Sequence, residues 1–284
     1  MTIQRVGVIG GGLMGSGIAE VAARAGCDVK VHEIDESAAE AGRQRVGGSL
    51  SRAVDRGKIS QSEAEAISSR INFGTELEGQ ADRQIVIEAA TENEALKRGL
   101  FSSLDQVLTD RDAILASNTS SIPITRLASA TSRPDHVVGL HFFNPVPVMA
   151  LVELVTTVRS SPAVADRAQA FAEGLGKTVI RARDRAGFVV NMLLIPYMLS
   201  AVRMLEGGFA TPEDIDAGMR LGANHPMGPL ELADFVGLDT TKFVADVLFE
   251  EFKEPLYASP PLLTRMVESG LHGRKSGRGF YQYD

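Results

Sequence analysis

The sequence predicts an α/β fold: a doubly wound sheet with an inserted helical hairpin, followed by an all-helical domain. Short apolar runs alternate with helical segments up to about residue 184, and from residue 187 onward only helical patterns remain. Uninterrupted apolar runs are typical of parallel strands, because helices cover both faces of their sheet. We therefore expect one domain over residues 1–184 and a second over residues 187–284, with the boundary in the segment 183–187.

The first strand is expected at residues 3–9, and a glycine-rich run follows it and opens a helix. Gly10, Gly12 and Gly15 have the spacing G-x-G-x-x-G. The first glycine permits a tight turn, the second lets backbone N–H groups approach a pyrophosphate, and the third lets helix and strand pack closely. The helix N-terminus adds partial positive charge, which favours phosphate binding.

The second strand, residues 28–32, is followed by an acidic residue, Glu33. This carboxylate follows the last glycine by roughly the 20 residues of the dinucleotide-binding pattern, so it can accept hydrogen bonds from the hydroxyls of an adenosine ribose. Glycines alone also cluster in ordinary turns. Strand, glycine loop, helix, strand and acid together predict a Rossmann-like dinucleotide-binding domain.

Residues 36–58 and 60–69 are expected to form the helical hairpin, because a long helical pattern precedes a capping box that opens a short helix. One face of the long helix carries Arg45, Ser49, Arg52 and Arg56 at positions i, i+4, i+7 and i+11. A basic face on an acidic protein favours a polyanion such as a nucleotide phosphate. A solvated surface beside Asp55 is the alternative that the spacing leaves open.

The remaining elements continue this pattern along the chain. Further strands are expected at 71–73, 84–88, 113–117, 137–142, 150–156 and 178–181, with helices at 93–108 and 163–175 among others. In the second domain, helical patterns cover 188–206, about 212–220, 229–252 and 261–269. Prolines at 212, 229 and 261 occupy positions that a first helical turn tolerates.

A histidine and a glutamate are candidates for proton transfer. His141 lies in a strand, and Glu153 lies within the next apolar strand, where a carboxylate is costly unless it is paired. Across neighbouring strands Glu153 could fix the tautomer of His141 and stabilise its protonated ring, which suits a histidine that exchanges a proton with a substrate hydroxyl. A core histidine with satisfied hydrogen bonds is the alternative.

Polar residues also follow two other strands. The segments 87–93 and 116–121 lie at strand ends, where open α/β sheets gather ligands. Turn and capping chemistry is the alternative for the second segment, with Ser121 capping a helix that starts near Pro123. Asn191, inside an apolar helix, needs a polar partner.

Composition argues against several classes of protein. The net charge of −7 disfavours nucleic acid as a partner, and polar residues and a proline interrupt the apolar segment 188–205, which disfavours a membrane span. The single cysteine, Cys27, cannot form an internal disulfide, and the N-terminus leads directly into the first strand, so we expect a cytoplasmic protein. The sequence has no metal-binding or serine-hydrolase motif, so no metal is expected.

At the motif level the chain resembles the short-chain L-3-hydroxyacyl-CoA dehydrogenases, most closely the bacterial 3-hydroxybutyryl-CoA dehydrogenases of about this length. The motifs that carry the resemblance cover nearly the whole chain in order. They are VIGGGLMGSGIA (8–19), ASNTSS (116–121), GLHFFNPV (139–146), LVEL (151–154), GFVVN (187–191), PMGP (226–229) and KSGRGFY (275–281).

The resemblance implies roles for individual residues. His141 takes the place of the family's general base and Glu153 holds it, while Ser120 and Asn191 contact the reacting oxygen or the thioester region. The residues expected to bind NAD are Gly10, Gly12, Leu13, Met14, Gly15, Glu33, Glu92, Lys97, Ser120, Asn144 and Lys275. Ser49 and Arg56 match residues that contact CoA, and we expect Arg52 on the same face to join them.

The expected function is the NAD-dependent, reversible oxidation of a short (S)-3-hydroxyacyl-CoA to a 3-oxoacyl-CoA. Dehydrogenation of a small sugar acid, as in lambda-crystallin-like relatives, is one alternative, but such a substrate has no use for the basic face. A non-catalytic dinucleotide-binding protein is another, and the presence of both His141 and Glu153 weighs against it. The resemblance also implies a homodimer formed through the helical domain.

The chain departs from the family's pattern at three positions. Glu33 stands where aspartate is common, so its longer carboxylate leaves the strength of the preference for NAD over NADP open. Arg56 stands where lysine is common and keeps the charge. Gly11 stands where alanine is frequent, a change expected to matter little.

Overall fold

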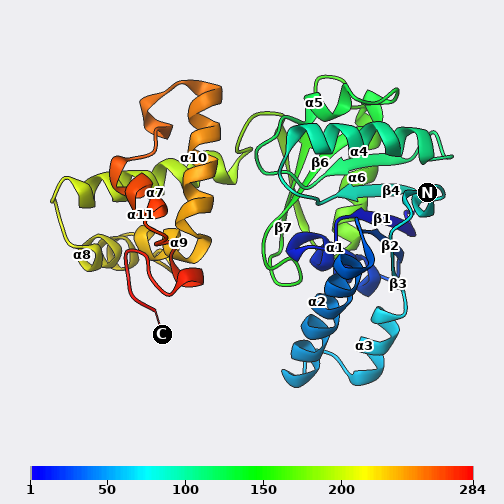
Figure 1. The fold of residues 1–284 in the computed structure, drawn as a ribbon, viewed down its shortest axis with the longest axis horizontal. Coiled ribbons are helices and arrows are strands. Elements are labelled where there is room, and N and C mark those ends of the chain that lie inside the picture. Colours follow the sequence, from blue (N-terminus) through cyan, green and yellow to red (C-terminus); the bar gives the residue numbers. More distant parts are fainter. Residues whose placement is uncertain (1, 284) are drawn as a thin grey trace. The chain divides into compact units, whose positions relative to one another are not determined.

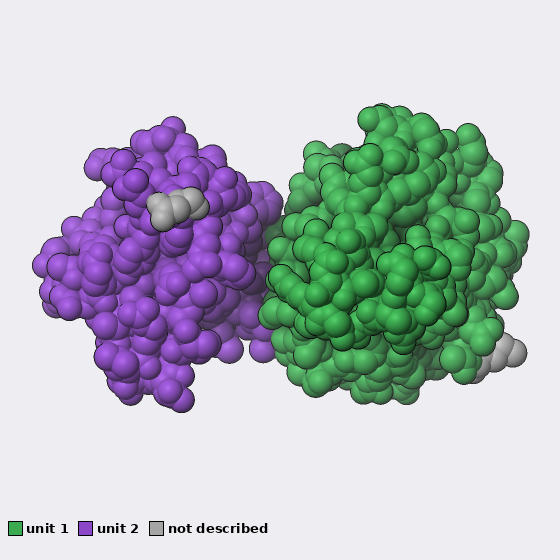
Figure 2. All heavy atoms as spheres, turned by 90° about the horizontal axis from the view of Figure 1, so that it is seen from below, with its two compact units in different colours: residues 1–185 green, residues 186–284 purple. Residues whose placement is uncertain are grey.

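The structure, a computed structural model, describes residues 2–283, and the chain divides into two compact units, residues 1–185 and 186–284 (Figure 2). The first unit is an eight-stranded sheet with flanking helices, and the second is helical (Figure 1). The predicted fold class, an α/β unit followed by an all-α unit, is confirmed. The division lies within the segment 183–187, where the sequence changes from alternating to purely helical patterns.

The sheet has the strand order β3-β2-β1-β4-β5-β6-β7-β8. Its strands are β1 (Arg5–Ile9), β2 (Asp28–His32), β3 (Ile71–Gly74), β4 (Ile85–Glu88), β5 (Ile114–Ser117), β6 (Val137–Phe142), β7 (Leu151–Thr156) and β8 (Thr178–Arg183). The chain builds outward from β1 to β3 and then returns to place β4 on the other side of β1. This reversal creates the switch point at which open α/β sheets bind ligands.

One strand pair departs from the parallel arrangement that apolar runs suggest. β6 and β7 pair antiparallel, while all the other neighbouring strands named above are parallel. The connection from Phe142 to Leu151 is too short for a parallel crossover, which needs roughly a dozen residues or more. The reversal sets the residues of β6 directly opposite those of β7.

Helices cover the sheet and include the expected helical hairpin. The helices of this unit are α1 (Leu13–Arg24), α2 (Glu36–Asp55), α3 (Gln61–Ser68), α4 (Glu94–Val107), α5 (Ile124–Ala128) and α6 (Pro162–Gly174). α2 and α3 form the hairpin, and the predicted capping box between Ser60 and Glu63 is present. The hairpin extends away from the sheet (Figure 1).

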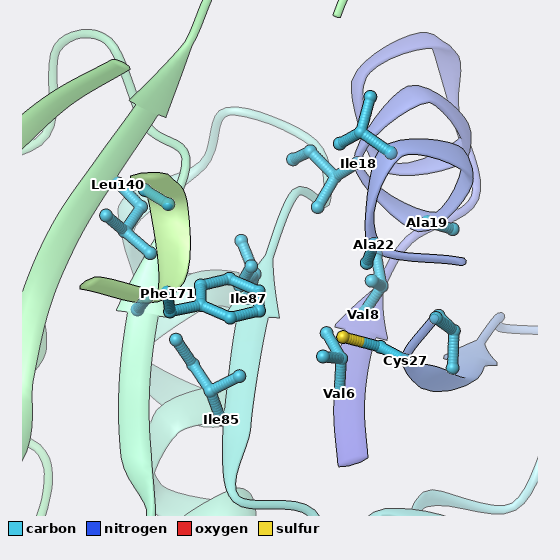
Figure 3. Packing of buried hydrophobic residues seen from close by; sticks show 14 of the residues in the cluster. Val6, Val8, Ile18, Ala19, Ala22, Cys27, Ile85, Ile87, Leu140 and Phe171 are labelled. Atoms are coloured by element: carbon cyan, nitrogen blue, oxygen red, sulfur yellow. The ribbon is translucent and has the colours of Figure 1, made fainter. Parts of the chain in front are cut away.

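Apolar side chains from helices and strands form one core in this unit. Figure 3 shows Ile18, Ala19 and Ala22 of α1 beside the valines of β1, and Phe171 of α6 beside the isoleucines of β4. All of these side chains are buried. The core therefore holds β1, α1 and β4 together, and these elements surround the glycine loop.

The second unit has helices α7 (Val190–Glu206), α8 (Pro212–Ala217), α9 (Pro229–Val236), α10 (Leu238–Phe252) and α11 (Pro261–Glu268). The prediction of one helix over 229–252 is wrong, because the chain turns at Gly237, whose φ of +103° favours glycine. α8 is also shorter than predicted, and a π-helical turn follows it at 218–222. Buried Asp216 accepts hydrogen bonds from two backbone N–H groups that start α9 and from the Tyr281 hydroxyl.

The three glycines of the predicted loop meet different surroundings. Gly10 has φ of +91°, in the region that favours glycine. A Cβ on Gly15 would lie 1.7 Å from the carbonyl oxygen of Gly10, so helix α1 packs on this turn without room for a side chain. A Cβ on Gly12 would meet no protein atom within 4 Å.

These surroundings predict opposite effects on stability for two alanine substitutions. Gly15→Ala forces the backbone apart, so it should lower the free energy of unfolding by about 2 kcal/mol or more. Gly12→Ala, at an open position with negative φ, should change it by less than about 0.5 kcal/mol. Urea unfolding of both variants measures the difference, and equal losses would contradict the packing described for Gly15.

Candidate active site

Several loops meet at one edge of the sheet. The register aligns Ile9, Glu88, Ser117 and Gly139 across β1, β4, β5 and β6, so β1, β4 and β5 end side by side and β6 continues past them to Phe142. The loops that follow them carry many of the predicted site residues of this unit. Ligands of open α/β sheets bind outside such carboxyl ends.

His141 and Glu153 lie directly opposite each other on the antiparallel strands β6 and β7. Opposed residues of an antiparallel pair project to the same face of the sheet. The Nδ1 atom of His141 lies 2.7 Å from Oε2 of Glu153, and both side chains are buried. An ionised Glu153 accepts a hydrogen bond from the N–H at Nδ1 of His141. It therefore fixes the tautomer with hydrogen on Nδ1 and stabilises a positive charge on the ring. Nε2 is then the ring atom that exchanges a proton.

The loop 118–122, between β5 and α5, is tied to the strand that carries His141. Asn118 Oδ1 accepts a hydrogen bond of 2.9 Å from the backbone N–H of Phe142. The Thr119 hydroxyl oxygen accepts hydrogen bonds from the backbone N–H groups of Ser121 and Ile122. These bonds hold Ser120 in a tight turn near the end of β6.

Ser121 does not cap the following helix, although capping was the alternative reading of this segment. Its hydroxyl donates to Oε1 of Glu92 at 2.7 Å. The first N–H groups of α5 instead donate to the carboxylate of Asp184, which lies far along the chain.

A buried group of charges lies behind this loop. Lys97 of α4 forms ion pairs with Glu88 at 2.6 Å and with Glu92 at 3.2 Å. Glu92 also accepts hydrogen bonds from the hydroxyls of Thr119 and Ser121. Burial by itself raises the pKa of Glu92, but the Lys97 charge and these hydrogen bonds outweigh it and hold the pKa below its usual range. Glu92 is therefore a carboxylate at neutral pH.

The glycine loop and Glu33 are joined by a direct hydrogen bond. The Glu33 carboxylate accepts from the backbone N–H of Gly11 and from that of Ile34. Gly12 and the exposed side chain of Leu13 border the open start of α1, and Met14 is half-buried beside them. The open space over Gly12, the helix N-terminus and the nearby carboxylate fit the pyrophosphate and ribose of a dinucleotide.

The basic face of α2 is exposed. Arg45, Arg52 and Arg56 are exposed and Ser49 is half-buried. Within residues 2–283, no carboxylate lies at ion-pair distance from any of these three arginines, Asp55 included, whereas Arg43 on the same helix pairs with Glu36 and Glu40. Arg45 donates to the carbonyl oxygen of Gly11, so this face begins beside the glycine loop. The arginines therefore offer positive charge to a ligand.

The remaining predicted residues lie elsewhere. Asn144 is exposed in the loop after β6. In the second unit, Asn191 lies in the first turn of α7, and Lys275 forms an ion pair of 2.6 Å with Asp239. Burial by itself raises the pKa of Asp239, but the hydrogen bonds from Lys275 and from the Thr240 backbone, together with the nearby positive charge of Lys275, outweigh it and lower the pKa. Asp239 thereby fixes the direction of the Lys275 side chain.

Glu88 and Asn118 lie in the polar segments 87–93 and 116–121 that the sequence places at strand ends, but neither received a role of its own, and Asp239 was not named. Glu88 gave a usable signal, since it is a charge at the end of an apolar strand, as Glu153 is within one. Asn118 gave only its place at a strand end, and Asp239 gave no signal, because the partners of both residues lie far along the chain. Over the described range 2–283, no helix is long and apolar enough to cross a membrane. The same range contains no group of three side chains arranged to hold a metal.

Two family models match the chain. The one described as "3-hydroxyacyl-CoA dehydrogenase, NAD binding domain" matches residues 5–185. The one described as "3-hydroxyacyl-CoA dehydrogenase, C-terminal domain" matches residues 187–283.

The relatives match over nearly their full length. A 3-hydroxybutyryl-CoA dehydrogenase of Mycobacterium tuberculosis is 59% identical over 99% of this chain and 99% of its own. The mitochondrial hydroxyacyl-coenzyme A dehydrogenase of Homo sapiens is 42% identical, covering 99% and 91%. Among solved structures, M. tuberculosis FadB2 has a TM-score of 0.98 at 58% identity, and the (S)-3-hydroxybutyryl-CoA dehydrogenase PaaH1 of Ralstonia eutropha has 0.95 at 44%, each covering 100% of both chains.

The lowered pKa of Glu92 predicts a pH-dependent contribution to stability. A carboxyl whose pKa is lower in the folded state stabilises the fold above its ordinary pKa of about 4.3 and loses this contribution as pH falls through the folded value. Wild type should therefore be more stable than Glu92→Gln at pH 6–7, and the difference should shrink below about pH 4. Urea unfolding across pH 3–7 measures it, and a constant difference would contradict the assignment.

Proposed function

Because the chain belongs to the 3-hydroxyacyl-CoA dehydrogenase family, we propose that it interconverts (S)-3-hydroxybutyryl-CoA and acetoacetyl-CoA with NAD. Family membership confirms the resemblance stated from the motifs, the oxidoreductase class and NAD as the cofactor. The observation that carries the proposal is the buried His141–Glu153 pair at the edge of the sheet where the glycine loop also ends.

In the direction of oxidation, Nε2 of His141 accepts the proton of the 3-hydroxyl group. Glu153 keeps the proton on Nδ1 and stabilises the imidazolium that forms. NAD, when bound, supplies the acceptor for the hydride that leaves C3 of the substrate. In the reverse direction the imidazolium returns its proton to the 3-oxo group, so the ring is restored to its neutral form.

Two further sets of residues support the assignments of cofactor and substrate. The glycine loop, Glu33 and the start of α1 fit the cofactor's phosphates and ribose. The unpaired arginines of α2 favour a substrate with phosphates, as CoA has, over a small sugar acid. The contacts of Glu92, Lys97, Ser120, Asn144, Asn191 and Lys275 with substrate or cofactor stay predictions. A cytoplasmic location is also proposed, on the strength of the single Cys27, which cannot form an internal disulfide.

The direct test is steady-state reduction of acetoacetyl-CoA with NADH and with NADPH. NADH should be preferred, because a 2′-phosphate would lie close to the Glu33 carboxylate, and like charges at a binding site cost several kcal/mol, roughly a hundredfold or more in affinity.

His141→Gln should lower kcat by about 10²–10⁴-fold, the usual contribution of a general base, while NADH still binds. Glu153→Gln should also lower kcat, because an amide cannot stabilise the imidazolium.

The double variant separates a working pair from two independent residues. If His141 and Glu153 act as one unit, their combined effect should be far smaller than the product of the single effects. Full multiplication would show that they act separately. A His141→Gln enzyme that keeps kcat within about twofold, far below the general-base range, would place the base elsewhere.

The arginines of α2 are expected to anchor CoA. Arg52→Ala with Arg56→Ala should raise KM for acetoacetyl-CoA much more than KM for a truncated thioester that lacks the nucleotide. Arg43→Ala is the matched control, since the charge of Arg43 is already paired with Glu36 and Glu40. Equal changes for both thioesters would indicate that the face is only solvated surface.

We further propose that the helical unit forms a homodimer with a second copy of this chain. The support is an open apolar cavity of about 540 Å³ along α7, together with the exposed side chains of Leu193 and Phe235 that line it. Leu193→Glu should convert a dimer to a monomer in light scattering at micromolar concentration. Val158→Glu, at an exposed apolar position in the first unit, should not. A monomeric wild type would contradict the proposal.

A further inference from the structure

One lysine of the first unit is buried without a carboxylate partner. Lys177 lies between α6 and β8 and is only 9% exposed. Its ammonium group donates to the carbonyl oxygen of Val146 at 2.5 Å and to that of Met149 at 2.8 Å. Within residues 2–283 no carboxylate lies at ion-pair distance from it, and the charge of nearby Arg24 has the same sign. A buried charge is costly unless it is hydrogen-bonded, so these two carbonyl oxygens hold the ammonium group in place.

Both oxygens belong to the loop 143–150, which joins β6 to β7. A turn within this loop is closed by the backbone N–H groups of Val148 and Met149, which both donate to the carbonyl oxygen of Pro145 at 2.9 Å. The two oxygens that the lysine binds lie within this turn and at its end. The ammonium group therefore holds the turn as a whole.

The same loop packs against the helix that follows the glycine loop. Val146 is buried, and a Cβ placed on Gly17 of α1 would lie only 2.8 Å from the Cβ of Val146. A side chain at position 17 would displace the valine, so the glycine lets the loop approach the helix. The loop is therefore fixed between α1 on one side and Lys177 on the other.

The beginning of the loop lies beside the proposed base. The ring of Phe143 has its centroid 4.7 Å from that of His141, at an angle of 59° between the ring planes. The next residue, Asn144, is exposed and is one of the residues expected to bind NAD. A shift of the loop would move Phe143 and Asn144 relative to His141, whose position is set by the pairing of β6 with β7.

Packing alone does not require a charge at this position. A methionine has nearly the volume of a lysine, and its burial removes no charge from water. An apolar side chain would, however, leave the two carbonyl oxygens without their donor. A charged donor also forms stronger hydrogen bonds than a neutral one. The ammonium group of Lys177 is therefore suited to fixing a loop.

We propose that Lys177 is a positioning residue that fixes the loop 143–150, and with it Asn144, relative to His141 and the start of α1. It acts on the use of NADH through the loop and contacts neither cofactor nor substrate. The inference rests on the proposed function for its kinetic consequence, while the order of the loop is a property of the protein itself.

The first test compares Lys177→Met with wild type in acetoacetyl-CoA reduction. A displaced loop should lower kcat/KM for NADH by about 10²-fold, the loss that a misplacement of about 1 Å causes. KM for acetoacetyl-CoA should stay within about threefold, because the arginines of α2 are untouched. Lys30→Met is the matched control, since Lys30 pairs with Asp82 on the surface of the same unit, and it should leave both constants unchanged.

An unchanged kcat/KM for NADH in Lys177→Met would overturn the proposal. If Lys177→Met does not fold, Lys177→Gln takes its place, because its amide buries no charge and is one bond too short to reach both carbonyl oxygens. An unchanged kcat/KM for NADH in that variant would overturn the proposal equally.

A double variant tests whether the lysine acts through Asn144. Asn144→Ala should lower kcat/KM for NADH on its own. Adding Lys177→Met should then lower it by less than about threefold further, because residues that act as one unit are not additive. A lysine that only stabilised the fold would have the same effect in both backgrounds. Full multiplication of the two effects, or no effect of Asn144→Ala, would contradict this route.

Added amines test the role of the ammonium group itself. Lys177 lines a cavity of about 380 Å³ together with Arg24 and the exposed Val148, so Lys177→Ala leaves a space that a small cation can enter. Ethylammonium, which has N–H donors, should raise kcat/KM for NADH in this variant by about tenfold, since a hydrogen bond from a charged donor is worth that much. Tetramethylammonium has the same charge and no N–H group, so it should not. Equal rates with the two cations would contradict the role of the donor.

Amide hydrogen exchange separates this inference from the proposed function. Lys177→Met should speed exchange of the N–H groups of Val148 and Met149 by about tenfold or more, while exchange in β1 and β4 keeps its wild-type rate. This readout needs no acyl-CoA, so it decides the role of Lys177 even if wild type does not reduce acetoacetyl-CoA. Unchanged exchange in the loop, or equal acceleration throughout the first unit, would contradict a positioning role.

Discussion

The pairing of His141 with Glu153 is the interaction on which the rest of the site depends. Glu153 lies within an apolar strand, fully buried, and a carboxylate there is tolerated only with a partner that satisfies it. The antiparallel register of β6 and β7 supplies that partner from directly across the sheet. The two strands therefore set both the position of the imidazole and the nitrogen that carries its structural hydrogen bond.

The neighbouring loops are built around this pair by hydrogen bonds between distant segments. Asn118 reaches from the end of β5 to Phe142, and Glu92 gathers the hydroxyls that follow Asn118. The glycine loop is joined to Glu33 in a similar way, through the N–H of Gly11. Each loop is thus held by a buried or partly buried carboxylate or amide.

Sequence reasoning predicted those features that depend on neighbours along the chain. The glycine spacing, the capping box at Ser60 and the basic face of α2 are local patterns, and the structure contains each of them. The pairing of Glu153 with His141 could be inferred because a charge in an apolar strand demands a partner. Together with the ordered motifs, these patterns were enough to identify the family.

Features set by distant partners could not be predicted in this way. The cap of α5 comes from Asp184, and no local pattern links that residue to the helix. The break at Gly237 separates two helical patterns that run on continuously in the sequence, because one glycine is tolerated within a helix as well as at a turn. Glu33 was expected to face a ribose, and its bond to Gly11 depends on how closely the loop approaches β2.

The central claim is that Glu153 holds the hydrogen on Nδ1 of His141, so that Nε2 exchanges the proton. Nitrogen-15 NMR of histidine-labelled protein measures this directly, because protonated and bare ring nitrogens have distinct shifts. At a pH where the ring is neutral, the account predicts that the His141 signal shows hydrogen on Nδ1 and a bare Nε2, and that Glu153→Gln disturbs this state. A neutral His141 with hydrogen on Nε2 and a bare Nδ1 would contradict it.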